Sequence, residues 1–319
     1  MPRFSPSAIV RLLAMIVAAA FALTPGLLVG AETTAGKPTI FVLGDSTAHN
    51  TAKGKNGEPC AGWGTPLADY FDSAKAEVAN VAHAGTSSRT YYTNAGDWPK
   101  VLPRIKAGDF VLIVFGINDG SAPPAPNARG SLPGLGDETV EVKRADGSVE
   151  IARTYGWYMS SMANAAREKG AHVTFLTVTT RDIWTNPKGV TFRAGVPSRP
   201  LPADYDPKED RIERGTANGR YTQWTKDLGQ KLEIPVLDLT NLCADRYESM
   251  GRAAVDVFYS DHNHTYLAGA DFVARAVVAG LKAFPQSEFV PLLSEKGRAV
   301  PAADAKYVSE NARANAALR

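Results

Sequence analysis

Short apolar runs recur along the chain at intervals long enough to hold a helix between them. Five runs are apolar throughout or nearly so, which is typical of strands buried on both faces of a parallel sheet. They cover residues 39–43, 77–82, 110–115, 172–178 and 236–239. This pattern predicts a five-stranded sheet.

The stretches between these runs carry helix signals. Three of them are long enough for full helices: residues 155–169, 221–232 and 267–284. The last repeats apolar side chains every four positions, at Val273, Val277 and Leu281. A shorter helix is expected where Thr65 precedes Pro66. Because strands alternate with helices, the sequence predicts an α/β fold, a three-layer α/β/α sandwich around a central, mostly parallel five-stranded sheet.

Two stretches interrupt the alternation. Residues 121–153 begin as a loop rich in Pro and Gly and continue as two alternating segments, 139–142 and 149–152, around an Asp-Gly pair. Such a pattern is typical of a β-hairpin. Residues 186–219 are rich in Pro, Gly and charge, so we expect a loop at the rim of the site. Both stretches are candidates for contact with a substrate.

The amino terminus has the three parts of a secretory signal. Arg3 and Arg11 precede an apolar run at 12–23, and the small residues at 29–31 offer a cleavage site before Glu32. A membrane anchor is the alternative, but a Thr-Pro-Gly turn ends the run short of the roughly 20 apolar residues that a span needs. We therefore expect a secreted or periplasmic protein. Its expected parts are a signal peptide at 1–31, one folded domain at 32–285 that includes the 121–153 hairpin, and a tail at 286–319.

The composition excludes one class of partner. With 319 residues, of which 44% are hydrophobic and 21% charged, the chain is long enough for one large domain or two small ones. Its net charge of +2 and the lack of basic runs argue against binding nucleic acid. Cys60 and Cys243 can pair in an oxidising compartment or remain separate buried thiols, and the sequence leaves both open.

Candidate chemistry appears at the end of the first strand, where Gly44, Asp45 and Ser46 follow one another. Open α/β sheets bind ligands at the carboxyl ends of their strands. A serine at such an end can be a nucleophile, with its backbone N–H facing an oxyanion. Taken alone, the motif is explained as well by an ordinary turn.

A base and an orienting carboxylate follow near the other end of the chain. Asp261 and His264 lie three residues apart, so a turn entering a helix puts the carboxylate beside the imidazole. The alternative is a metal site built from Asp261, His262 and His264. Two histidines separated by one residue, with no further ligand downstream, make a poor ligand set, so no metal and no cofactor are expected.

Two further loops supply hydrogen-bond donors. Gly85 follows the second strand, and its lack of a side chain lets its N–H approach a reacting carbonyl. Asn118 follows the third strand and can offer its side-chain amide to the same oxygen. Each loop alone is ordinary, but all four motifs lie in order at strand ends or at the start of a helix. The predicted triad is Ser46, Asp261 and His264, and the predicted oxyanion hole is Ser46, Gly85 and Asn118.

The order of these motifs resembles the four blocks of the SGNH (GDSL-like) hydrolase superfamily over residues 39–284: Gly44-Asp45-Ser46, Gly85, Gly-x-Asn-Asp at 116–119 and Asp261-x-x-His264. Within it, the chain is similar to the bacterial rhamnogalacturonan acetylesterases, carbohydrate esterase family 12. Closer cues are Gly62-Trp63-Gly64 and Tyr155-Gly156-Trp157-Tyr158. Ile117 stands where that family often has a histidine, so one polar contact near the oxyanion is missing.

The resemblance implies a flavodoxin-like fold and a secreted serine esterase that removes acetyl groups from galacturonic acid residues of pectin. Acetylated plant cell-wall polysaccharide or oligosaccharide is then the partner, and no membrane is expected as a partner once the signal is removed. An acetylxylan or broad short-chain esterase is the alternative among enzymes. A non-catalytic carbohydrate-binding protein is the alternative from another class, although the intact motifs argue against it.

Contacts with a substrate are assigned to three side chains near predicted strand ends, Arg89, Arg181 and Trp184. A guanidinium suits a uronate carboxylate, although each of the three can equally belong to a salt bridge or to the core. His49 and His83 flank the first two motifs, and we expect them to pack or hydrogen-bond behind the site.

Overall fold

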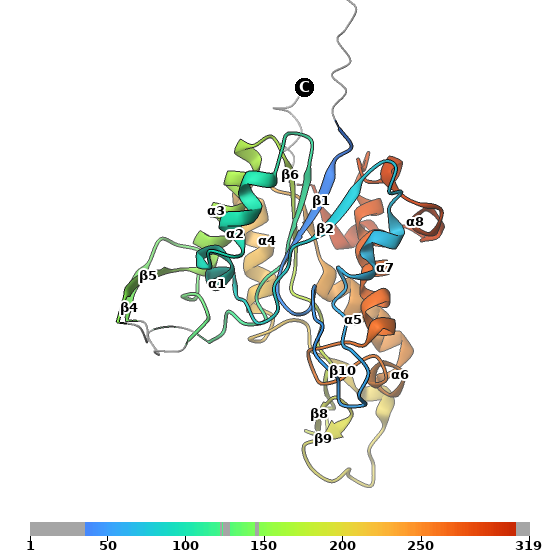
Figure 1. Cartoon of the computed structure of the whole chain (residues 1–319). Helices are drawn as coiled ribbons and strands as arrows, with labels where there is room; N and C mark the ends of the chain where they lie inside the picture. The colour runs from blue at the N-terminus through green and yellow to red at the C-terminus, as the bar shows by residue number, and fades with distance from the viewer. Residues whose placement is uncertain (1–35, 122, 124–127, 144–146, 311–319) are drawn as a thin grey trace, which may run out of the picture. The chain divides into compact units, whose positions relative to one another are not determined.

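Six strands form the main sheet of the computed structural model, which describes residues 36–121, 123, 128–143 and 147–310. They are β1 (Thr39–Leu43), β2 (Glu77–Asn80), β3 (Phe110–Ile113), β6 (His172–Leu176), β11 (Val236–Leu237) and β12 (Val308–Ser309). Their order across the sheet is β12-β11-β6-β3-β1-β2 (Figure 1). The predicted signal peptide at 1–31 lies outside the described residues.

The five predicted strands are present and parallel. β1 has the predicted bounds, and the other four each end two residues earlier than predicted. The sheet nevertheless has a sixth strand, because β12 from the tail pairs antiparallel with β11. Two residues are too few to show alternation, so β12 could not be predicted from its residues. The parallel strands follow the flavodoxin-like order, and their carboxyl ends share one edge of the sheet.

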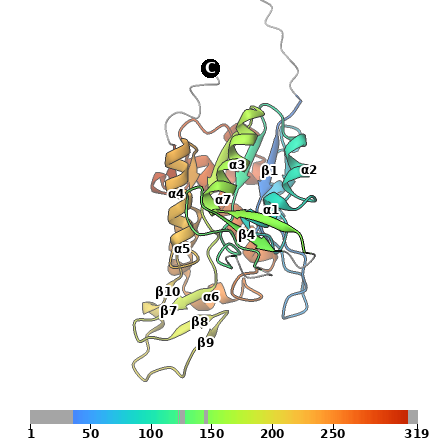
Figure 2. The ribbon, with the colours of Figure 1, turned by 90° about the vertical axis from the view of Figure 1, so that its left-hand side faces the viewer.

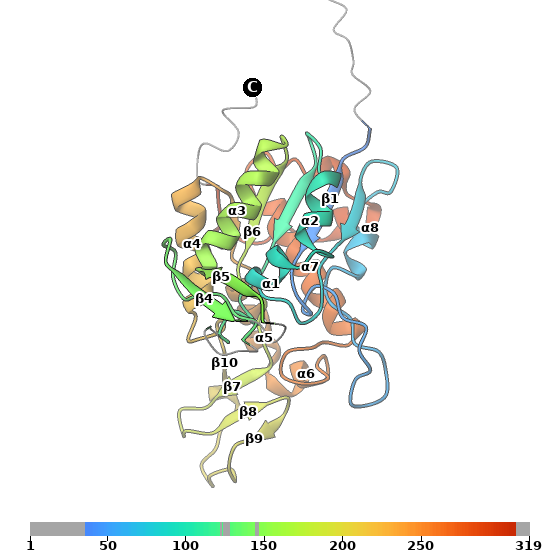
Figure 3. The same cartoon turned by 60° about the vertical axis from the view of Figure 1, so that its left-hand side comes forward.

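Helices cover both faces of this sheet (Figures 1 and 3). One face carries α1 (Ser88–Thr93), α2 (Trp98–Val101), α3 (Tyr155–Glu168) and α4 (Arg220–Leu232), and the other carries α5 (Leu239–Met250), α7 (Leu267–Ala283), α8 (Glu295–Ala299) and the 3₁₀ helix η1 (Pro66–Tyr70). Because side chains alternate along a strand, Phe41 and Val42 of β1 enter two different apolar clusters. The three long predicted helices are confirmed to within one residue, and so is the three-layer sandwich.

Shorter helical segments complete the chain: α6 (Arg252–Asp256), η2 (Leu102–Arg104), η3 (Pro207–Glu209), η4 (Val290–Leu292) and η5 (Ala305–Tyr307). None of the helices in the described part is long and apolar enough to cross a membrane. Cys60 and Cys243 are separate buried thiols rather than a disulfide.

Two smaller sheets are attached to the sandwich. The predicted hairpin is present as β4 (Thr139–Lys143) and β5 (Val149–Arg153), which pair antiparallel. The stretch 186–219 was predicted to be a loop. It instead supplies three strands of a four-stranded antiparallel sheet. The four strands of this sheet are β7 (Ile183–Thr185), which precedes that stretch, and β8 (Thr191–Arg193), β9 (Val196–Pro197) and β10 (Arg211–Ile212), which lie within it. This small sheet projects beyond the carboxyl ends of the main strands (Figures 1 and 2).

Candidate active site

Ser46 lies in the turn that follows β1, at the carboxyl end of the main sheet. Thr47 donates its N–H and its hydroxyl to Asp45 Oδ1, each at 2.9 Å, and these bonds fix the turn. A Cβ on Gly44 would lie 2.9 Å from Val114, so only glycine lets the chain turn this close to β3. Ser46 is 6% exposed, which leaves its hydroxyl at the base of the site.

His264 connects Ser46 to Asp261. Its Nε2 lies 2.9 Å from Ser46 Oγ, and its Nδ1 lies 2.8 Å from Asp261 Oδ2. The other oxygen of Asp261 accepts the N–H groups of Asn263 and His264 at 2.7 and 2.9 Å, so the spacing of three residues is closed by a turn. The structure therefore brings the three predicted triad residues into one hydrogen-bonded line.

The carboxylate of Asp261 is held in its charged form. Burial alone would raise its pKa, but the hydrogen bonds from His264 and from two backbone N–H groups keep the pKa below its ordinary value. A charged Asp261 fixes the proton of His264 on Nδ1, because that nitrogen must then donate. Nε2 is left as the acceptor facing Ser46, which is the arrangement that a general base requires.

The predicted oxyanion donors lie on neighbouring loops. Gly85 has φ +84°, a left-handed conformation that favours glycine. Within the part of the chain that the structure describes, neither Gly85 N–H nor Ser46 N–H donates a hydrogen bond. Asn118 Nδ2 donates one bond to Thr86 O at 2.8 Å, beside Gly85, and an amide nitrogen carries a second hydrogen. Two free N–H groups and this amide can bind the oxygen of a tetrahedral intermediate.

Sequence reasoning missed the support for these loops. Asp119 is fully buried and accepts hydrogen bonds from Ser88 N–H at 3.2 Å and from Ser131 Oγ at 2.8 Å. Burial raises the pKa of Asp119, and the hydrogen bonds oppose that rise. The available signal was a charged residue in the loop that follows a buried strand, since such a residue needs partners if the loop is buried.

The structure buries two of the three predicted substrate contacts, Arg89 and Trp184. Ser87 caps α1 and exchanges hydrogen bonds with Thr90, which makes the following residues helical and turns Arg89 inward. Arg89 is 4% exposed and donates to the carbonyl of Ala128. Trp184 is 1% exposed, and its indole N–H donates to Asp182 at 2.9 Å, so it belongs to the core.

Arg181 lies near the site but already has a partner. Its Nε and Nη2 both donate to Glu213 at 2.7 Å, which occupies the fork that a uronate would need. The next residue, Asp182, donates its N–H to the carbonyl of His262 at 3.0 Å and so ties the small sheet to the site. Burial, together with Arg181, lowers the pKa of the His262 imidazole.

The two histidines behind the site behave as expected. His49 Nδ1 lies 3.1 Å from the carbonyl of Ala82, and His83 Nδ1 lies 2.7 Å from Asp97 Oδ1. Among the described residues, no group of three or more His, Cys, Asp or Glu side chains is arranged to hold a metal ion.

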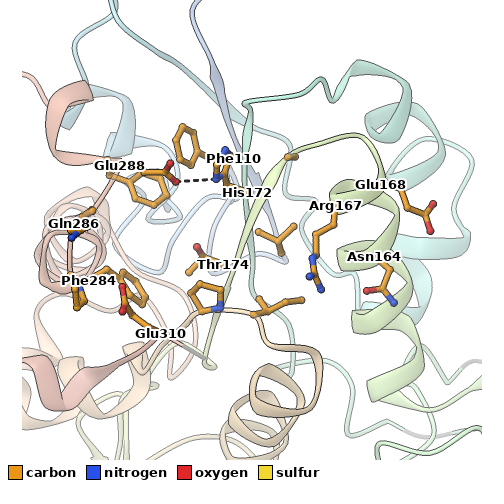
Figure 4. Close-up of a pocket in the computed structure, with 17 residues that line it drawn as sticks. Phe110, Asn164, Arg167, Glu168, His172, Thr174, Phe284, Gln286, Glu288 and Glu310 are labelled. Carbon is orange, nitrogen blue, oxygen red and sulfur yellow. Dashed lines mark ion pairs between the residues drawn. The ribbon is translucent and has the colours of Figure 1, made fainter. Parts of the chain in front are cut away.

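A cleft of 540 Å³ lies at the other end of the sheet, where β3 and β6 begin (Figure 4). His172 Nδ1 lies 2.9 Å from Glu288 Oε2 at its wall, and the imidazole stacks on Phe110. Arg167 and Asn164 of α3 line the opposite wall. None of the predicted site residues lines this cleft.

Comparison with known proteins agrees with this geometry. The model of the GDSL-like Lipase/Acylhydrolase family matches residues 42–270. A rhamnogalacturonan acetylesterase of Emericella nidulans is 30% identical over 239 residues, which are 75% of this chain and 82% of that protein. The rhamnogalacturonan acetylesterase RhgT of Bacillus subtilis is 27% identical over 212 residues, 66% of this chain and 69% of that protein.

The crystal structure of protein YxiM from Bacillus subtilis has the same fold. It superposes with a TM-score of 0.53 at 24% identity and covers 77% of this chain and 56% of that chain. The family match spans all four motifs, from the end of β1 to the start of α7. The chain therefore belongs to the GDSL-like Lipase/Acylhydrolase family and is a carboxylic ester hydrolase.

Proposed function

We propose that this protein is a carbohydrate acetylesterase that removes acetyl groups from pectic rhamnogalacturonan. The observation that carries the proposal is the continuous line from Asp261 through His264 to Ser46, with distances of 2.8 and 2.9 Å. The choice of an acetylated pectin rests on the two rhamnogalacturonan acetylesterases among the similar proteins.

Acylation begins when Ser46 Oγ attacks the carbonyl carbon of the acetyl ester. His264 Nε2 takes the serine proton, and Asp261 stabilises the imidazolium through Nδ1–H. The carbonyl oxygen becomes negative and receives hydrogen bonds from Ser46 N–H, Gly85 N–H and Asn118 Nδ2. When the intermediate collapses, His264 gives its proton to the sugar oxygen, which leaves as a hydroxyl and leaves acetyl on Ser46.

Deacylation repeats these steps with water. His264 Nε2 takes a proton from water while the water oxygen attacks the acetyl carbon on Ser46. The second intermediate uses the same oxyanion donors, and its collapse breaks the bond to Ser46 Oγ. His264 returns the proton to Ser46, and acetate leaves. The balance is one water consumed, with one sugar hydroxyl, one acetate and one proton formed.

The test is acetate release by the purified chain from acetylated rhamnogalacturonan, with acetylated xylan as the comparison polymer. We expect release from rhamnogalacturonan at a higher kcat/KM than from xylan. Ser46→Ala should lower kcat by roughly 10⁶-fold, because the nucleophile is lost while the fold is kept. Release from xylan alone would keep the mechanism and overturn the substrate, and no release from either polymer would overturn the proposal.

We also propose that the protein is exported and that residues 1–31 are removed. The basic and apolar segments of that stretch and the small residues before Glu32 support this. Mass spectrometry of the amino terminus of the protein, recovered from periplasm or medium, should find Glu32 first. A protein that stays in the cytoplasm with its first residues intact would contradict it.

A further inference from the structure

Arg129 is an exposed cation directly beside the oxyanion donors. Its Nη1 donates to the carbonyl of Gly85 at 3.0 Å, on the residue whose N–H is free. A Cβ on Gly85 would lie 3.5 Å from the same nitrogen. The guanidinium is therefore in contact with the loop that binds the reacting carbonyl.

Buried groups fix the backbone on both sides of Arg129. Ser87 Oγ donates to the carbonyl of Arg129 itself, and Arg89 donates to the preceding carbonyl. Gly130 N–H donates to Ser121 O at 2.7 Å, and Ser131 Oγ donates to Asp119. This loop is thus held from the interior, although the side chain that it presents is exposed.

The guanidinium of Arg129 has N–H donors available for a ligand. No carboxylate in the described part of the chain pairs with it, whereas Arg181 is bound through two nitrogens by Glu213. Only Nη1 is used by Gly85, so Nε and Nη2 can form the two parallel bonds that a carboxylate accepts. An arginine without an acidic partner beside an ester-hydrolysing centre suits an anionic substrate.

We propose, on the basis of the function proposed above, that Arg129 determines substrate preference by binding the carboxylate of the acetylated galacturonate. In a uronic acid, the acetylated hydroxyl and the carboxylate belong to the same six-membered ring. When the acetyl carbonyl meets Gly85 N–H, the ring therefore lies at the entrance to the site, next to the guanidinium. Arg129 takes the role that the sequence assigned to Arg89.

The experiment compares two forms of one substrate. Acetylated galacturonate oligosaccharides are assayed beside the same oligosaccharides with their carboxylates converted to neutral N-methylamides. The measured quantity is the ratio of kcat/KM for the acidic form to kcat/KM for the amide form. For Arg129→Gln we expect this ratio to fall roughly 10- to 100-fold, the loss of a hydrogen-bonded charge contact. Arg129→Lys should fall in between, because it keeps the charge and loses the fork.

Arg167→Gln is the matched control. Arg167 Nη1 also donates to a carbonyl at 3.0 Å, that of Leu232, and its side chain is also exposed, but it lines the cleft at the amino ends of the strands. Arg167→Gln removes the same charge from the protein as Arg129→Gln but lies away from the site. Its ratio of kcat/KM for the acidic form to kcat/KM for the amide form should therefore equal that of the wild type. Raising the salt concentration should lower the ratio for the wild type more than for Arg129→Gln, because salt screens an exposed charge pair.

Failure of this inference differs from failure of the proposed function. If the wild-type enzyme released no acetate from the acidic oligosaccharide, both the proposed function and the proposed role of Arg129 would be overturned. With an active wild type, an equal loss on both substrates in Arg129→Gln would show that Arg129 supports the oxyanion loop rather than reading the carboxylate. An unchanged ratio in Arg129→Gln and Arg129→Lys would also overturn the inference.

Discussion

Each end of the main sheet holds a histidine paired with a carboxylate. At the carboxyl end, His264 Nδ1 lies 2.8 Å from Asp261 Oδ2, and at the amino end, His172 Nδ1 lies 2.9 Å from Glu288 Oε2. The two pairs are nearly identical in length. Only the first lies among the family motifs.

The difference lies on the other side of each imidazole. His264 Nε2 meets the hydroxyl of Ser46 at 2.9 Å, beside loops with free N–H groups. The ring of His172 instead stacks on Phe110, with 5.1 Å between ring centres. A histidine–carboxylate pair therefore carries no chemistry by itself. It needs a nucleophile and oxyanion donors, and the loops at the carboxyl ends of strands supply both.

Among changes to the two histidine–carboxylate pairs, the largest effect should come from removing the charge of Asp261. Asp261→Asn should lower kcat roughly 10⁴-fold, because an amide no longer fixes the proton of His264 on Nδ1. Steady-state acetate release measures the loss, and circular dichroism confirms the fold. If Asp261→Asn kept more than a tenth of the wild-type kcat, the pair at the carboxyl end would have no greater catalytic role than the pair at the amino end.

The second largest effect on kcat should come from removing an oxyanion donor. Asn118→Ala should lower kcat roughly 10²- to 10³-fold with little change in KM, because its amide bonds to charge that develops in the transition state. The matched change at the other end, Asn164→Ala, lies in the cleft of Figure 4 and should leave kcat unchanged. If KM alone rises in Asn118→Ala, the amide binds the ground state and its assigned role is wrong.

The burial of Asp45 beside Ser46 should lower the free energy of unfolding at neutral pH. Burial raises its pKa from 3.8 to about 6, so the folded chain keeps a proton that the unfolded chain has lost. The contribution of Asp45 to stability should therefore fall as pH rises from about 4 to about 6 and stay lower above that. The loss is about 3 kcal/mol above this window.

Asp45→Asn should remove this contribution and so make stability fall less between pH 4 and pH 8, because the amide keeps the oxygen that accepts from Thr47 and carries no charge. Urea unfolding at pH 4 and pH 8 measures the free energy of both proteins. The variant should be the more stable at pH 8. Parallel pH profiles for the two proteins would show that Asp45 is not the source of the dependence.

The smallest effect is expected at the amino end. Glu288 is 52% exposed in its ion pair with His172, so breaking the pair by Glu288→Gln should cost no more than about 1 kcal/mol. Acetate release should stay within roughly twofold of wild type, because the pair touches no reacting group. A large fall in kcat would contradict this expectation and would show that the pair at the amino end affects catalysis at the carboxyl end.

The sequence predicted the features whose signals are local. Buried strands such as β1 and β3 are continuous apolar runs, and the triad residues lie in short motifs, Ser46 after β1 and the other two before α7. Asp261 and His264 needed only a spacing of three. Each motif alone was ambiguous, and the order of all four along the chain carried the assignment, while the structure adds the distances between them.

The remainder depended on contacts between distant segments. The burial of Arg89 could not be predicted, because it follows from the capping box of Ser87 and Thr90. Arg129 lies in a loop rich in Pro and Gly, and only its bonds to Gly85 and Ser87 bring it to the site. The small sheet escaped prediction because strands of two or three residues cannot show a period.

The strand β12 sets the limit for shortening the chain. Asp238 N–H donates to Tyr307 O at 2.7 Å, and the two residues of β12 then cover the edge of β11. An uncovered edge is a template on which another chain can pair and aggregate. A truncation after residue 285 would keep every catalytic group and still expose that edge, so solubility rather than catalysis decides where this enzyme can be cut.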